Sequence, residues 1–237
     1  MLQAYEGGNR LLDALPRAEI FGLIGELEVV MMPARASIQE PDASFRSVDF
    51  PIDAVYSVIA ALSNGDACEV GTVGREGFIA AEAVLGVSVA RRTVVCQVPG
   101  RIARMRTDAF ARILPDSPEL ARLAQRNVAA RLFAAEQYTT CNLMHTVVAR
   151  CARWLLMTRD RVGRDQFPLT QDYLATMLGV RRAGVTQAAT SLRSIGALEY
   201  HRGNVSIISA PLLERAACEC YQATRDAFEN ALLATGR

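Results

Sequence analysis

One stretch near the C-terminus decides the fold: residues 168–208 read PLTQDYLATMLGVRRAGVTQAATSLRSIGALEYHRGNVSII. Thr170 is a favourable helix N-cap, and the apolar residues after it recur at helical spacing. Gly179 then stands where a tight turn between two helices needs a residue that tolerates positive φ. The stretch therefore predicts a short helix, a turn and a second helix that starts at Arg181 or Arg182.

The second helix has one apolar and one polar face. Val185, Ala188 and Leu192 point toward a core by their spacing, which leaves short polar and basic side chains on the outside. Arginine can donate two hydrogen bonds to guanine, and glutamine can pair both ways with adenine. We expect base contacts from Arg182 and Gln187.

A hairpin follows this helix. Residues 198–208 read LEYHRGNVSII, which predicts two alternating strands around a turn with Arg202 at its tip, the pattern of a β-wing. Side chains at the helix starts and at the wing tip suit phosphates. The candidate DNA-contacting residues are Thr170, Gln171, Arg181, Arg182, Ala183, Thr186, Gln187 and Arg202.

The charge distribution agrees with this interpretation. The whole chain carries a net charge of +1, yet residues 150–210 contain nine arginines and four acidic residues. A basic segment in an otherwise mildly acidic chain is typical of a polyanion-binding module. A scatter of solvated arginines is the alternative.

The preceding part of the chain reads as strands and then a long helix. Four β-runs (27–32, 54–62, 67–73 and 93–98) predict an antiparallel roll, and Asn64-Gly65 predicts a type I′ hairpin turn. After Pro115, one apolar stripe recurs at steps of three and four as far as Val147. Such a helix is hard to bury within one subunit, so we expect a homodimer, with an intrachain core helix as the alternative.

These features together resemble the Crp/Fnr family of bacterial transcription regulators. The resemblance covers about residues 20–210 and rests on DFPIDAVYSVIAALSNGDACEVGTVGREGF and LTQDYLATMLGVRRAGVTQAATSLRSIGALEYHRGNVSI. It implies a sensor roll, a dimer helix, double-stranded DNA and RNA polymerase as partners, and a cytoplasmic location. Family members commonly place an Arg-Glu pair and a later Arg in the recognition helix, where this chain has Arg182, Ala183 and Gln187.

The resemblance also suggests an effector site in the roll. Cyclic-nucleotide receptors of the family hold the ribose with a Gly-Glu and the phosphate with an Arg-Ser/Thr ten residues later. Glu82, Arg92 and Thr93 fall at this spacing, but Ala81 replaces the glycine. Two alternatives stay open: a cyclic nucleotide or other anion binds here, or Arg92 is a surface residue of a roll without an effector.

The sequence gives little support for disulfides, metal or haem sites, or redox-active thiols. The six cysteines follow no secretory start, so we expect reduced thiols. The first cysteine is Cys68 and the only histidines are His145 and His201, so neither an iron–sulfur cluster nor haem nor another metal is expected. Cys218 and Cys220 should point to different sides of a final helix as inert thiols, with redox sensing as the alternative.

Enzyme and membrane classes are also disfavoured. The chain has no glycine-rich nucleotide loop, HExxH or GxSxG motif, so we expect no enzyme. Charges or prolines interrupt every apolar run before about 18 residues, so we expect no membrane span.

The sequence thus predicts an α+β chain with four parts. These are a β-roll sensor domain with an N-terminal helix (1–114), a dimerisation helix (115–146), a winged helix-turn-helix (147–210) and a C-terminal helix (211–237). The alternative function is a signal-binding or protein-interaction module that has lost DNA binding.

Overall fold

A β-roll forms the N-terminal body of the computed structural model, which describes residues 5–233. One sheet has the strand order β1-β7-β3, from Glu28–Met32, Gly100–Arg106 and Ser47–Pro51. The other has the order β2-β6-β4-β5, from Ser37–Gln39, Thr93–Val98, Val55–Ala61 and Ala67–Val73. All strand pairs are antiparallel, so the predicted roll is confirmed.

Short helices surround the roll and lead into a long one. They are α1 (Arg10–Asp13), α2 (Arg17–Ile24), the 3₁₀ turn η1 (Ala81–Leu85), α3 (Thr107–Ile113) and the 3₁₀ turn η2 (Leu114–Asp116). The four β-runs that the sequence indicated correspond to β1, β4, β5 and β6, whereas β2 and β3 lie between β1 and β4 in the chain and β7 follows β6. The roll core contains the aromatic cluster Phe50, Phe78 and Phe110.

The β4–β5 hairpin is present, but its predicted turn type is wrong. Gly65 has a positive φ of 88°, whereas Asn64 does not have positive φ. The amide N–H of Leu62 donates to the carbonyl of Asp66, which closes a longer loop. The Asn64 Oδ1 accepts the Asp66 N–H at 3.0 Å, so Asn64 stabilises the loop through its side chain instead.

The long helix α4 (Pro118–Met144) ends sooner than the predicted stripe. Pro118 occupies its first turn, and Leu120, Leu123 and Ala124 pack into the roll core. His145 is extended, with φ −107° and ψ 150°, and Thr146 caps the next helix, α5 (Val147–Val162). The stripe is therefore broken before Val147, and a change of direction separates the two helices.

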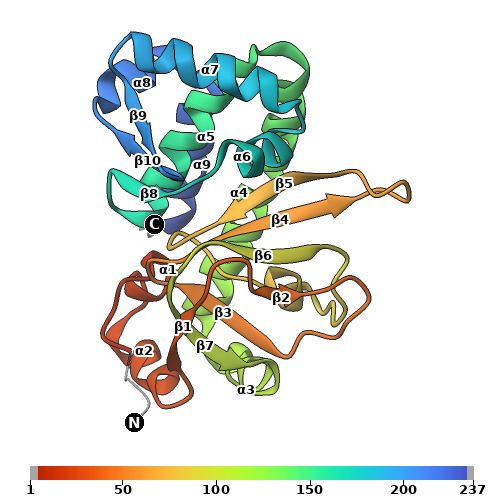
Figure 1. The fold of residues 1–237 in the computed structure, drawn as a ribbon. Coiled ribbons are helices and arrows are strands. Elements are labelled where there is room, and N and C mark those ends of the chain that lie inside the picture. Colours follow the sequence, from red (N-terminus) through yellow and green to blue (C-terminus); the bar gives the residue numbers. More distant parts are fainter. Residues whose placement is uncertain (1–4, 234–237) are drawn as a thin grey trace.

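The C-terminal body contains the elements that the quoted stretch predicts. Strand β8 (Gln166–Pro168) precedes α6 (Gln171–Leu178), α7 (Arg182–Ser194), β9 (Leu198–His201) and β10 (Asn204–Ile207). The three strands pair in the order β8-β10-β9. Figure 1 shows this body above the roll, with α4 running between them and α7 on the side away from the roll.

The chain ends in two helices, not in the single helix expected. Helix α8 (Ala210–Ala216) and helix α9 (Cys220–Leu232) are separated by a non-helical segment that contains Cys218. Helix α9 packs along α4, and Phe228 and Ala231 contact Ala130 and Ala134 there. Part of the α4 surface is therefore covered by the same chain.

Among the described residues, no helix combines the length and the apolar character needed to cross a membrane.

Candidate DNA-binding surface

Helices α6 and α7 form a rigid corner. The Oγ1 of Thr170 accepts the Tyr173 N–H at 3.2 Å, which caps α6, and Gly179 ends it with a φ of 61°. Val185, Ala188 and Leu192 on α7 are fully buried against α5 and α6. The backbone of α7 is therefore fixed on its apolar side.

The opposite face of α7 is exposed and polar. The side chains of Arg181, Arg182, Ala183, Thr186, Gln187 and Thr190 all lie on it. Arg182 Nε is 3.2 Å from Asp172 Oδ1, and both side chains are about two-thirds exposed. An exposed ion pair of this kind contributes little to stability, so Arg182 can exchange Asp172 for another hydrogen-bond acceptor.

A second polar contact joins the two helices. Thr186 Oγ1 lies 2.9 Å from Gln171 Oε1, so these two predicted contact residues meet across the corner. Arg202 occupies the tip of the β9–β10 turn with a φ of 45°, followed by Gly203 with a φ of 79°. Arg181 and Arg202 form no ion pair within residues 5–233, which leaves both guanidinium groups available to an anion.

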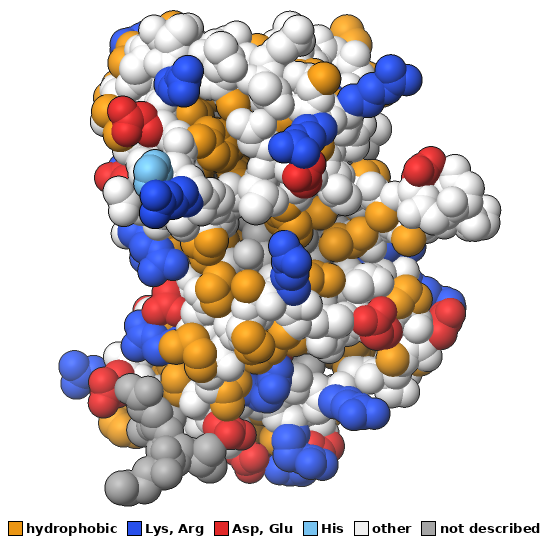
Figure 2. Space-filling model, in the orientation of Figure 1, with side chains coloured by type: hydrophobic (Ala, Val, Ile, Leu, Met, Phe, Trp, Pro, Cys, Tyr) orange, Lys and Arg blue, Asp and Glu red, His pale blue; other side chains and the backbone are white. Residues whose placement is uncertain are grey.

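The basic surplus of residues 150–210 is only partly on the surface. Arg150, Arg153 and Arg161 on α5 are 7%, 5% and 5% exposed, so they cannot contribute to a DNA-binding patch. Figure 2 shows separate basic side chains on the upper body and no continuous basic patch on the face it presents. The charge count thus predicted more surface charge than α7 and the wing carry.

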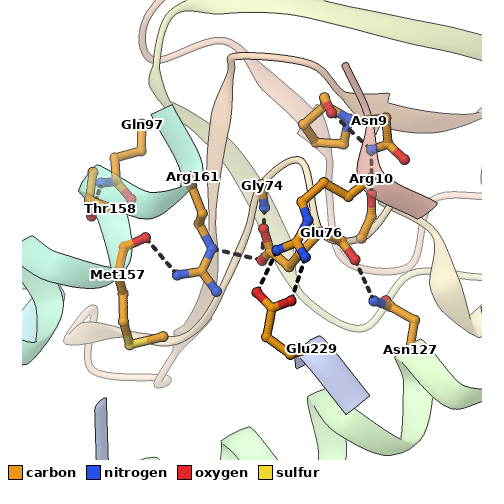
Figure 3. A network of polar contacts seen from close by, with 12 residues as sticks. Asn9, Arg10, Gly74, Glu76, Gln97, Asn127, Met157, Thr158, Arg161 and Glu229 are labelled. Carbon is orange, nitrogen blue, oxygen red and sulfur yellow. Dashed lines mark hydrogen bonds and ion pairs between the residues drawn. The ribbon is translucent and has the colours of Figure 1, made fainter. Parts of the chain in front are cut away.

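Two of these buried arginines hold the two bodies together. Arg161 Nε on α5 donates to Glu76 Oε1 in the roll at 2.7 Å, with both side chains buried (Figure 3). The guanidinium of Arg153 lies 4.6 Å from the centroid of the Tyr138 ring on α4. Burial without a partner would be costly for either cation, so each contact fixes α5 against its neighbours.

Further polar contacts surround the Arg161–Glu76 pair. Asn127 on α4 donates from Nδ2 to the Glu76 carbonyl at 2.9 Å, and Arg10 donates to Glu229 of α9 at 2.7 Å. Figure 3 shows that these side chains converge from the N-terminal helix, the roll, α4, α5 and α9. The position of the C-terminal body is thus defined by several elements at once.

A second interface lies between the β4–β5 hairpin and the helices α5 and α6. Trp154 Nε1 donates to Glu69 Oε1 at 2.8 Å, and the Tyr173 hydroxyl is 3.1 Å from Ser57 Oγ. Burial raises the pKa of Glu69 to about 7, although Ser57, Trp154 and the charges of Arg153 and Arg161 act to lower it. Trp154 thus packs α5 against the β4–β5 hairpin.

The roll does not assemble the predicted phosphate-binding residues. Glu82 lies on η1 at a cavity of about 260 Å³ between the roll and α4. Arg92 donates to the Arg91 carbonyl, and Thr93 Oγ1 lies 3.4 Å from Glu40 Oε2. Neither Arg92 nor Thr93 lines the cavity beside Glu82. Within the described part of the chain, no hydrogen bond or ion pair joins Glu82 to Arg92 or Thr93.

The same cavity contains a basic residue that sequence analysis missed. Arg131 on α4 lines it, and burial lowers the pKa of its guanidinium while Glu82 acts to raise it. Arg131 lies three residues after Val128 and four before Ala135, on the same helix face as the apolar stripe, but the stripe was traced through apolar residues alone and passed over it. Only the packing of α4 on β5 brings it beside Glu82.

Comparison with known proteins agrees with this architecture. Residues 149–216 match the Crp-like helix-turn-helix domain. Among solved structures, FixK2 from Bradyrhizobium japonicum is 15% identical with a TM-score of 0.69, and the match covers 81% of this chain and 98% of that one. The chain has the Crp/Fnr fold. The predicted resemblance and the predicted fold class are therefore confirmed.

Two other solved structures show similar agreement. The c-di-GMP-responsive regulator CLP from Xanthomonas campestris is 14% identical, with a TM-score of 0.65 and coverage of 82% of this chain and 100% of that one. A CRP-family transcriptional regulator from Thermus thermophilus is 18% identical, with a TM-score of 0.62 and coverage of 79% and 96%. No curated protein sequence matches the chain.

Proposed function

We propose that this chain is a sequence-specific transcription regulator that binds double-stranded DNA as a homodimer in the cytoplasm. The observation that carries the proposal is the exposed polar face of α7, held by a buried apolar back within a Crp-like helix-turn-helix domain. A helix presented in this way enters the major groove with its first residues at the base edges. Arg182 and Gln187 are the proposed base readers, with Ala183 beside them.

Phosphate contacts position the domain around these base contacts. Arg181 is the N-cap of α7 and Thr186 lies one turn into that helix, Thr170 and Gln171 lie at the start of α6, and Arg202 lies on the wing. They lie in the first two turns of the helices or at the tip of the wing, where side chains and backbone N–H groups can reach the DNA backbone. They contribute affinity and register more than sequence preference.

The second half of α4 supports dimerisation. Leu132 and Leu143 are 63% and 79% exposed in the single chain, and Phe133 and Met144 are also exposed. Exposed apolar side chains on one helix favour an isologous contact with a second copy. A dimer would place its two α7 helices in successive major grooves about 34 Å apart on a pseudo-palindromic site. RNA polymerase is the proposed further partner.

An effector remains a separate proposal. The cavity beside Glu82 and Arg131 has room for a small anionic ligand, whereas Arg92 and Thr93 would have to move to join it. Cyclic nucleotides are the probe to use first. A rearrangement on binding would shift the angle between roll and DNA-binding body.

Selection of bound DNA from a random pool tests these proposals. The purified protein would be used alone and, in parallel, with cyclic nucleotides. A palindromic motif without ligand supports a regulator whose roll is structural or senses something else. A motif only with nucleotide assigns Glu82, Arg92 and Thr93 to an effector site, whereas no motif under any condition overturns DNA binding in favour of the interaction module.

A further inference from the structure

Four side chains with metal-ligand chemistry meet where α4 ends. Cys141 lies in the last turn of α4 and His145 directly follows this helix, whereas Cys218 lies between α8 and α9 and Cys220 is the first residue of α9. Their nearest ligand atoms all lie within 4.8 Å of one another. The three cysteines are buried and are free thiols.

We propose that these residues form a Cys₃His site for one zinc ion. The Cys141 and Cys218 sulfurs are 3.5 Å apart, and the Cys220 sulfur is 3.6 Å from His145 Nδ1. Zn–S bonds of about 2.3 Å in a tetrahedron place two sulfur ligands about 3.8 Å apart. The observed separations therefore fit one ion at the centre, and a set of thiolates with one imidazole favours zinc over magnesium or calcium.

The surroundings orient two of the ligands. His145 Nε2 lies 3.3 Å from Glu219 Oε1, so a proton on Nε2 leaves the lone pair of Nδ1 directed at the sulfur cluster. Gln137 Nε2 donates to the Cys220 sulfur at 3.1 Å. A carboxylate behind a histidine ligand and an amide donor to a thiolate are the outer contacts that metal sites use.

A disulfide explains fewer of these contacts. A bond between Cys141 and Cys218 would leave Cys220 and His145, and the contacts of Gln137 and Glu219, without a role. The expectation of inert thiols on opposite sides of one helix is wrong in its premise, because Cys218 precedes α9 and lies beside Cys220. The other two ligands come from more than 70 residues earlier, so a search for short cysteine spacing could not find them.

The position of the site gives it a structural consequence. His145 lies in the break between α4 and α5, Cys218 lies just before α9, and Cys220 is the first residue of α9. A bound ion would join that break to the C-terminal helices and hold the DNA-binding body at one angle to α4. This consequence for DNA binding rests on the proposed function, whereas the metal site itself does not.

Metal analysis of the full chain, purified with a reductant, tests the site. We expect about one zinc ion per chain, and replacement by Co²⁺ should give the sulfur-to-cobalt charge-transfer absorption of a tetrahedral thiolate site. Cys218→Ser should lose both signals. The matched controls Cys68→Ser and Cys151→Ser alter cysteines outside the cluster and should keep them.

A milder variant keeps the test decisive if Cys218→Ser fails to fold. Glu219→Gln retains every ligand at an exposed position and should weaken zinc binding about 10- to 100-fold in competition with a chromophoric chelator. Absence of zinc and of the cobalt signal in the reduced wild-type chain would overturn the site, as would a Cys141–Cys218 disulfide formed in place of metal binding. A zinc-loaded chain that selects no DNA would leave the site standing and overturn the proposed function alone.

Discussion

Trp154 on α5 donates its indole N–H to Glu69 on β5, with 2.8 Å between nitrogen and oxygen. The same carboxylate accepts the Ser57 hydroxyl at 2.5 Å. This contact joins the roll to the helix-turn-helix body through a group whose pKa is raised to about 7 by burial. Because Trp154 is the only tryptophan in the chain, tryptophan fluorescence reports on the surroundings of this one side chain.

We predict that Trp154 fluorescence titrates with a midpoint near pH 7. An unfolded glutamate titrates near 4.3, so the unfolded chain loses this proton first as pH rises. The free energy of unfolding should therefore fall between about pH 4.3 and 7, relative to Glu69→Gln, and the difference should stay constant above that range. Glu69→Gln keeps an acceptor for the indole, and a titration that survives in this variant would contradict the assignment.

The Arg161–Glu76 pair should be costly to break. Glu76→Ala leaves the Arg161 guanidinium buried without its carboxylate, and we expect a loss of about 3–5 kcal/mol in the free energy of unfolding. Asp165→Ala breaks the Arg159 pair, whose side chains are 32% and 57% exposed, and should cost less than about 1 kcal/mol. Denaturant unfolding of both variants measures the difference, and equal losses would show that burial of the first pair is irrelevant.

Arg182 and Arg181 should differ in what they contribute to DNA binding. We expect Arg182→Ala to lose about 1–3 kcal/mol and to relax preference at one base pair, whereas Arg181→Ala should weaken all sequences similarly and reduce the salt slope by about 1. Binding titrations on the selected site and on single-base variants separate these effects. Sequence-independent losses from both variants would remove Arg182 as a base reader.

Asp172 should compete with DNA for Arg182. Asp172→Asn removes the carboxylate 3.2 Å from Arg182 Nε, so we expect tighter binding to the selected site. The same titrations measure it, with Asp165→Asn as a control that leaves α6 unchanged. Weaker binding would indicate that the pair positions Arg182 for the bases.

Leu132→Asp should dissociate the proposed dimer. The side chain is 63% exposed in one chain, so the substitution should change monomer stability by no more than about 0.5 kcal/mol. Leu62→Asp, at a similarly exposed position on the β4–β5 loop, is the matched control. Sedimentation velocity should show a monomer for the first variant and a dimer for the second, and a dimer in both would exclude this part of α4 as the contact.

The helix-turn-helix was predictable because its signals are local. Thr170, Gly179 and the spacing of Val185, Ala188 and Leu192 each act within a few residues, and the structure places all of them as expected. The four strong β-runs were found for the same reason. Strands β2, β3 and β7 were not found, because polar and charged residues interrupt their apolar pattern. Asp49 on β3 and Arg104 on β7, for example, form an ion pair across the sheet with 2.7 Å between nitrogen and oxygen.

Long-range contacts could not be predicted from local patterns. Arg150, Arg153 and Arg161 look like a basic surface in the sequence, yet their partners lie on other elements and draw them inward. Glu82 and Arg92 have the expected spacing of ten residues in the sequence, but the loop between them does not bring their side chains together. The four ligands of the proposed zinc site come from two segments that only the packing of α9 on α4 makes adjacent.

The packing of α9 also bears on how the chain reaches its native state. Helix α9 packs against α4, and its Glu229 accepts a hydrogen bond from Arg10 of α1. During synthesis, however, α9 is made after all the elements from α1 to α8. Domains generally fold as units in the order of synthesis. The roll and the helix-turn-helix can thus each form while the chain is still growing, but the arrangement that orients α7 is completed only when α9 emerges.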